Sequence, residues 1–304
     1  MGKYTEAEKL DIQVLNARNR IFGVEHPNTI DATASLAATY YCLGKYTESE
    51  KLEIQILDAR NRILGVEHPD TITAMGNLAT TYQNLGKYTE AEKLEMQVLV
   101  ARTRIFGVEH PDTIDATASL AATYYWLGKY TEAEKLEMQV LDARKRILGV
   151  EHPHTITAMA SLAATYYLLE RYTEAEKLEV KVLDARSRIL GVEHPDTVNA
   201  IKSLEATYQR MGKYTEAETL ETQAHVLKRR VPGSESPYTV INMANVEEAQ
   251  ETQVLDAGSK VPGEADLSST QVVLNIPAHA ILSNTTINHQ KKGMYFGNCC
   301  LNSL

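Results

Sequence analysis

A 42-residue repeat constrains the fold of this chain more than any other feature of its sequence. Residues 23–64 and 107–148 differ at only six of 42 positions. The segment Gly-Val-Glu-His-Pro occurs five times, and its first residues are Gly23, Gly65, Gly107, Gly149 and Gly191. A period of this length is typical of arrays in which each repeat buries its apolar face against its neighbours. We therefore expect an open, elongated array rather than a closed globule.

Each repeat is predicted to contain two helices and no strand. In the second repeat the first helix is expected from Pro69 to Leu85, because proline suits a first helical turn and apolar residues follow at helical spacing. The second helix is expected to begin near Tyr88 and to end at Gly107, which occupies the position of a left-handed cap. Pairs four residues apart should form on the outer side of these second helices: Asp58 with Arg62, Asp142 with Arg146, and Asp184 with Arg188.

The repeat resembles a known family. The string Leu-Ala-Thr-Thr-Tyr-Gln-Asn-Leu-Gly-Lys-Tyr-Thr-Glu-Ala-Glu, from Leu78 to Glu92, looks like a tetratricopeptide repeat (TPR). The longer form with Leu-Gly-x-Glu-His-Pro-Asp-Thr, from Leu64 to Thr71, is similar to the repeats of kinesin light chains. The same variety occurs in the C-terminal arrays of signalling ATPases of the NOD-like class. The resemblance implies an all-α fold, a right-handed superhelical TPR α-solenoid of antiparallel helix pairs, whose first helices line a concave groove.

The register of the repeat also predicts how the chain is divided. Because Met1 to Tyr4 aligns with Met211 to Tyr214, inside a repeat, we expect the chain to be a fragment of a longer protein or the product of a truncated gene model. Polar Ser, Thr and Asn residues dominate the end of the chain, which favours disorder there. The expected parts are a partial repeat with only the second helix (1–22), five full repeats (23–232), a degenerate repeat (233–265) and a tail of low order (266–304).

Composition excludes several classes of function. The chain has 31 Lys and Arg against 40 Asp and Glu, a net charge of −9, whereas a nucleic-acid surface needs a basic patch. Its three cysteines cannot form a disulfide framework, so a reducing compartment, the cytoplasm, is expected. No apolar run approaches the roughly 18 residues that span a bilayer. We therefore expect neither a nucleic-acid nor a membrane partner.

The recurrent polar residues do not predict catalysis. Five loop histidines recur 42 residues apart, whereas zinc ligands lie a few residues apart, so we interpret the histidines as backbone-bonded or solvent-facing. The glutamates that begin the second helices, such as Glu132 and Glu134, are interpreted as a solvated face that favours the helix dipole. Phosphate-loop, nucleophile-elbow and zinc-helix motifs do not occur in the sequence. The sequence predicts no enzyme activity, no cofactor and no metal site.

Positions that vary on this constant scaffold indicate a binding surface. One position of the first helix changes chemical class between repeats, as a recognition groove would, although drift at an exposed site is the alternative; it holds Cys42, Asn84, Trp126, Leu168 and Arg210. We expect Trp126 to be an aromatic anchor beside Tyr125 and Tyr167, since buried aromatic residues dominate binding hot spots. Polar side chains would add hydrogen bonds. The predicted partner-binding residues are Tyr41, Asn77, Gln83, Asn84, Tyr125, Trp126, Tyr167, Leu168, Gln209 and Arg210.

The sequence thus predicts a protein–protein interaction scaffold that binds a peptide or protein segment in its concave groove. The resemblance implies either cargo or adaptor binding like that of kinesin light chains, with the kinesin heavy chain complex as a partner, or a sensor array joined to an upstream ATPase domain. A structural spacer is the third alternative. Light chains use an Asn-rich, basic groove for acidic peptides that contain Trp. Here only Asn77 matches the Asn pattern and Ser stands at the other four positions, so the acidic preference is not carried over.

Overall fold

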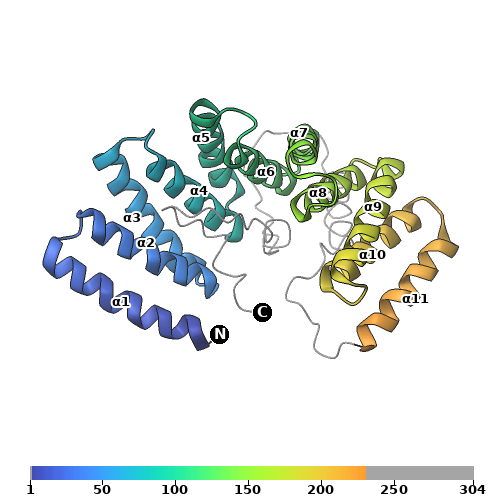
Figure 1. The fold of residues 1–304 in the computed structure, drawn as a ribbon, viewed down its shortest axis with the longest axis horizontal. Coiled ribbons are helices and arrows are strands. Elements are labelled where there is room, and N and C mark those ends of the chain that lie inside the picture. The colour runs from blue at the N-terminus through green and yellow to red at the C-terminus, as the bar shows by residue number, and fades with distance from the viewer. Residues whose placement is uncertain (1, 231–304) are drawn as a thin grey trace, which may run out of the picture.

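The computed structural model describes residues 2–230, which form helices joined by short connections (Figure 1). The helices of this part are α1 (Gly2–Phe22), α2 (Pro27–Cys42), α3 (Tyr46–Leu64), α4 (Pro69–Asn84), α5 (Tyr88–Phe106), α6 (Pro111–Trp126), α7 (Tyr130–Leu148), α8 (Pro153–Leu168), α9 (Tyr172–Leu190), α10 (Pro195–Arg210) and α11 (Tyr214–Arg230). The predicted helix pair of each repeat is therefore present. The degenerate repeat and the tail predicted for 233–304 lie outside the described residues.

The helices stack in chain order into an arc (Figure 1). Each helix packs against the one before it and the one after it. Among non-consecutive helices, the closest approaches join α4 to α6, α6 to α8, and α8 to α10. The even-numbered helices thus lie on the inside of the arc, and the odd-numbered helices from α3 to α9 lie on its outside. The predicted all-α solenoid is confirmed for the described residues.

Each inner helix begins in the same way. Its first residue is proline, and the histidine before that proline accepts a hydrogen bond at Nδ1 from the backbone N–H two residues later, as His68 does from Asp70 at 3.2 Å. This bond satisfies one of the donors that every helix start leaves without a partner inside the helix. The prediction that the loop histidines bond the backbone is confirmed at five positions: His26, His68, His110, His152 and His194.

The turn after each inner helix needs a left-handed residue. Glycine supplies it in most repeats, for example Gly128 with φ +73°. Glu170 takes the same place after α8 with φ +59°, and it is the non-glycine residue with positive φ among the described residues. A side chain in this conformation costs roughly 1–2 kcal/mol, because Cβ crowds the backbone. One turn of the array is therefore strained where its counterparts are not.

Replacing Glu170 should relieve this strain. We expect Glu170→Gly to raise the free energy of unfolding by about 1 kcal/mol, because the gain in the turn exceeds the entropy that glycine loses on folding. Urea denaturation followed by circular dichroism measures the change. The reverse substitution, Gly128→Glu, should lower stability by a similar amount. Equal effects of both substitutions would contradict the assignment of strain to this turn.

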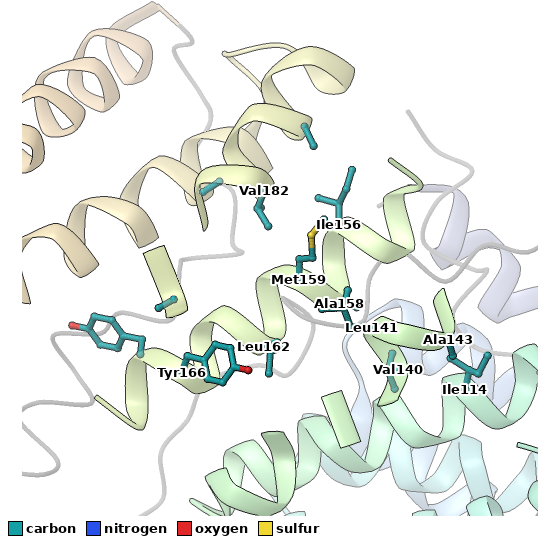
Figure 2. Close-up of a cluster of buried hydrophobic side chains, with 14 residues drawn as sticks. Ile114, Val140, Leu141, Ala143, Ile156, Ala158, Met159, Leu162, Tyr166 and Val182 are labelled. Carbon is teal, nitrogen blue, oxygen red and sulfur yellow. The ribbon is translucent and has the colours of Figure 1, made fainter. Parts of the chain in front are cut away.

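The hydrophobic core runs from one repeat into the next. Figure 2 shows one cluster to which α6 contributes Ile114, α7 contributes Val140, α8 contributes Met159 and Leu162, and α9 contributes Val182. All five side chains are buried. No repeat in this cluster encloses its own core, so stability depends on the contacts between neighbouring repeats.

Ion pairs follow the same connections between repeats. Arg171, at the start of α9, bonds Glu134 of α7 at 2.6 Å, and Glu134 is mostly buried there. The interpretation of Glu134 as part of a solvated face is therefore wrong, while Glu132 is exposed. The predicted pairs within the outer helices are confirmed at 3.1–3.2 Å. The equivalent pairs between repeats are Lys45 with Glu8, Lys87 with Glu50, Lys129 with Glu92, and Lys213 with Glu176.

Candidate binding groove

Helix α8 shows most clearly which side chains face the inside of the arc. Beyond Pro153 at its start, its residues are buried apart from five, namely Thr157, Ala160, Ser161, Ala164 and Leu168. Their spacing of three or four residues places them on one face of the helix. Because α6, α7, α9 and α10 cover the other faces, this stripe opens toward the inside of the arc (Figure 1).

The other inner helices carry the same stripe, and together these residues form what we call the inner stripe. Small side chains dominate it, so the backbone of a bound chain could approach the helices closely. Its members are Asp31, Ala34, Ser35 and Cys42 in α2; Thr73, Gly76, Asn77, Thr80 and Asn84 in α4; Asp115, Ala118, Ser119 and Trp126 in α6; the five residues of α8; and Asn199, Lys202, Ser203, Ala206 and Arg210 in α10.

Half of the residues predicted from the sequence lie on the inner stripe. These are Asn77, Asn84, Trp126, Leu168 and Arg210. Gln209 is exposed beside the stripe, and its amide donates to Glu205 at 3.1 Å. The small residues two helical turns before the variable position, such as Gly76 and Ala160, were not predicted as part of the groove. Counting back by seven or eight positions from the variable residue at the helix end would have found them, because that spacing keeps the same face.

The other four predicted residues are buried between repeats. Tyr41, Gln83, Tyr125 and Tyr167 are at most 7% exposed. Each precedes the stripe by one residue, which turns its side chain by about 100° away from the groove and toward the next repeat. The Gln83 amide donates to Glu95 and to Thr123, both at 2.8 Å. These four side chains therefore hold repeats together, and the expectation that they offer surface to a partner is corrected.

The buried tyrosines explain part of the variation at the end of the stripe. The Tyr41 hydroxyl accepts a hydrogen bond from Asn84 at 2.9 Å, and the Tyr167 hydroxyl accepts one from Arg210 at 3.3 Å. The corresponding neighbour of Tyr125 is Leu168, which has no donor, and the Tyr125 hydroxyl is buried with no hydrogen-bond partner among the described residues. The residue at the variable position therefore bonds a buried tyrosine hydroxyl in two repeats and does not do so in a third.

Removing one hydroxyl at a time should give effects of opposite sign. We expect Tyr125→Phe to raise the free energy of unfolding by about 1 kcal/mol, because it removes a buried hydroxyl that bonds nothing. Tyr41→Phe should lower it by about 1 kcal/mol, because it breaks the bond with Asn84. Thermal and urea denaturation of the two variants provide the test. A loss of stability in Tyr125→Phe would show that its hydroxyl is bonded after all.

Trp126 is the largest side chain on the inner stripe. Its indole stacks on the ring of Tyr88 with centroids 6.0 Å apart and meets Tyr125 edge-on at 5.4 Å. These contacts fix the orientation of the indole and leave it half-buried. A rigid, partly exposed aromatic side chain of this kind suits a contact residue, because little conformational freedom remains to be lost on binding.

Arginines from the outer helices reach the floor of the groove. Arg144 of α7 is buried, bonds Asp115 of α6 at 2.9 Å and donates to the main-chain oxygen of His154 at 3.1 Å. Arg60 meets Asp31 in the same way at 3.4 Å. In the alternate repeats threonine stands in place of the aspartate, at Thr73 and Thr157. The arginine itself is kept in α3, α5, α7 and α9, so the first four inner helices alternate only in whether an aspartate or a threonine lies opposite it.

A second buried row consists of carboxyl groups of the outer helices. Burial raises the pKa of Glu53, Glu95 and Glu137 to about 8 and that of Glu179 to about 7, although hydroxyl groups of the next repeat lower it in part. The residue type of these glutamates does not predict burial, but their position in the helix does. Glu53 lies three residues before the buried Ile56, on the same helix face.

Two further observations bear on the kind of site. Within residues 2–230, no group of three His, Cys, Asp or Glu side chains is arranged to hold a metal ion. In the same region no helix combines the length and apolarity that crossing a bilayer requires.

This architecture defines a class, the solenoid scaffolds made of repeated helix pairs, and comparisons give the family. The tetratricopeptide repeat model matches residues 1–55, 31–104, 80–145 and 112–188, and a second tetratricopeptide repeat model matches residues 198–227. The chain belongs to the tetratricopeptide repeat family. The predicted resemblance is thus confirmed, and scaffolds of this family generally serve protein–protein interaction. No curated protein is similar enough to count as a relative.

Solved structures agree with this assignment. A protein from Podosopora anserina described as a kinesin light chain with nearly identical TPR-like repeats is 28% identical, with a TM-score of 0.60, over 69% of this chain and 99% of its own. BtubC (BKLC) from P. vanneervenii shares the fold at 16% identity and a TM-score of 0.61, over 89% of this chain and 98% of its own. The kinesin light chain-like type of TPR array predicted from the sequence is therefore confirmed.

Proposed function

We propose that this chain is a non-catalytic scaffold that binds an extended peptide or protein segment along the inner stripe, as a cargo or adaptor module. The observation that carries the proposal is the single open face of α8, on which small residues alternate with the side chains that differ between repeats. A helix that is otherwise buried on every side keeps this face free. The small residues admit a backbone, and the variable ones supply selectivity.

The identity of the partner follows less directly from the groove. The 28% identical structure described as a kinesin light chain supports an adaptor role and, with it, the kinesin heavy chain complex as an associated partner. A sensor array joined to an ATPase domain would use the same groove, and a spacer would use none. A cytoplasmic location remains a prediction from the cysteine content. Binding at the inner stripe is the property that separates the first two roles from the third.

Blocking the groove should abolish binding. Peptides selected from a random phage-displayed library on the full chain would be measured by calorimetry against Ser161→Arg, which fills the inner stripe, and Gln139→Arg, which adds the same side chain to an exposed site on the outer helix α7. We expect at least a 10-fold loss for the first variant and no change for the second. Trp126→Ala should also weaken binding. Equal affinities for Ser161→Arg and Gln139→Arg would reject the groove.

A further inference from the structure

A second apolar surface runs along one edge of the array, away from the inner stripe. Where each outer helix ends and turns into the next inner helix, three large apolar side chains follow one another. Fourteen of these fifteen side chains are exposed, and Leu148 is half-buried. We call the set the apolar rim: Ile21, Phe22 and Val24; Ile63, Leu64 and Val66; Ile105, Phe106 and Val108; Ile147, Leu148 and Val150; and Ile189, Leu190 and Val192.

The lengths of the helices explain why these side chains are uncovered. Outer helices such as α7 have 19 residues, whereas inner helices such as α8 have 16. Ile147 lies seven residues after the buried Val140, on the same helix face, but in the last turn of α7. The core face of the outer helix thus continues into its final turn and emerges into solvent. Exposed apolar patches of such extent mark interaction surfaces.

Charges flank the apolar rim and balance one another. Arg146 in the last turn of α7 bonds Glu109, in the loop before α6, at 2.5 Å. Arg188 bonds Glu151 at 2.9 Å in the next repeat. The corresponding pairs earlier in the array are Arg62 with Glu25 and Arg104 with Glu67. The edge therefore offers acid and base in equal measure, which favours a partner that offers both.

We propose that the apolar rim joins two copies of this chain in an antiparallel pair, with the two-fold axis at the loop of the third full repeat. Val108 would then lie against the partner's Val108, and Val66 against the partner's Val150. A second copy carries apolar clusters at the same 42-residue spacing, and a two-fold contact places each acid–base edge against its own complement.

The size of the apolar rim fits a second copy of the chain as its partner. A stable interface uses about 20–30 residues and about 800 Å² on each side. The fifteen apolar rim residues, together with the Arg and Glu residues of the same edge, reach that number. The inner stripe stays open in such a pair, so dimerisation and peptide binding are independent properties of the chain.

One matched pair of variants tests the dimer. Val108 on the rim and Val100 on the outer face of α5 are both 69% exposed. Sedimentation of the full chain at micromolar concentrations should show a dimer. Val108→Glu should weaken self-association at least about 10-fold, while Val100→Glu and the groove variant Ser161→Arg leave it unchanged. Circular dichroism checks that all three fold. A monomeric wild type, or equal effects of the two valine substitutions, would overturn the proposal.

The orientation of the pair has its own readout. A photoreactive benzoylphenylalanine at position 108 should cross-link to the rim of the third repeat of a second copy, which isotope-mixed protein and mass spectrometry distinguish from a cross-link within one chain. Cross-links from position 108 to residues 231–304 of the same chain would show that this segment, rather than a second copy, covers the rim. That outcome would also overturn the proposal.

Discussion

The free energy of unfolding should fall by several kcal/mol, and by at most about 9 kcal/mol, between pH 6 and pH 8.5 because of the buried carboxyl row. In the folded chain Glu53, Glu95 and Glu137 keep their protons up to about pH 8, and Glu179 up to about pH 7. In the unfolded chain all four would lose them near the ordinary glutamate pKa of 4.5. Between pH 4.5 and these folded-state pKa values, unfolding releases protons from the four carboxyl groups, so a rise in pH favours the unfolded chain.

The magnitude follows from the number of groups. Each proton released contributes about 1.4 kcal/mol per pH unit. The full sum for four groups over this window is about 9 kcal/mol, which is comparable with the roughly 5–15 kcal/mol that holds a typical domain together, so repeats open locally before all four ionise. The stabilisation is complete below pH 4.5 and is lost as pH rises through 7 and 8. Neighbouring carboxylates, such as Glu92 beside Glu95, act in the same direction.

A single substitution separates the effect of the buried carboxyl row on the pH dependence of stability from the effect of the exposed charged groups. Glu95→Gln keeps an oxygen that can accept the 2.8 Å bond from Gln83 but cannot ionise, so the slope of stability against pH should drop by about one proton. Glu132→Gln on the exposed face of α7 should leave the slope unchanged. Urea titrations at five pH values measure both. Parallel pH profiles for the wild type and Glu95→Gln would show that this carboxyl is ionised in the folded chain.

The sequence predicted those features that depend on local spacing and missed those that depend on the neighbouring repeat. Pro69, Gly86 and the apolar residues between them mark a helix by short-range geometry, and the structure agrees with them. Gln83 and Asn84 are both polar residues, yet Gln83 is buried and Asn84 lies on the inner stripe. The two side chains point about 100° apart around the helix axis, and the position of the next repeat determines which of them is covered. For the same reason the burial of Glu95 could not be predicted from its residue type alone.

The alternation between aspartate and threonine on the groove floor shows how the array tolerates variation. Asp115 is paired with Arg144, while Thr157, its counterpart in the next repeat, bonds its own helix at the oxygen of Pro153 at 3.1 Å. Each arrangement satisfies the side chain that it contains. The arginine is kept in both repeats, as Arg144 and Arg186. Loss of the arginine should therefore cost more than exchange of the aspartate for threonine.

Arg144→Met should lower the free energy of unfolding by about 1–3 kcal/mol, because it removes a charge-assisted bond from the partly buried Asp115 carboxylate. The oxygen of His154 would also lose its 3.1 Å bond. Arg146→Met is the matched control, since Arg146 lies two residues later, forms ion pairs with Glu109 and Asp142, and has a side chain that is 56% exposed. Exposed pairs contribute about 0–1 kcal/mol, so this variant should be nearly as stable as the wild type.

A double substitution decides between charge and packing as the cause. In Arg144→Met with Asp115→Thr, the second change supplies the threonine of the alternate repeats and removes the unpaired carboxylate, so at least 1 kcal/mol of the loss should return. Denaturation of the four chains in one double-mutant cycle gives the coupling energy. Additive effects would mean that Arg144 acts through packing alone. Recovery together with unchanged peptide affinity would show that the paired charges stabilise the groove floor without contacting the ligand.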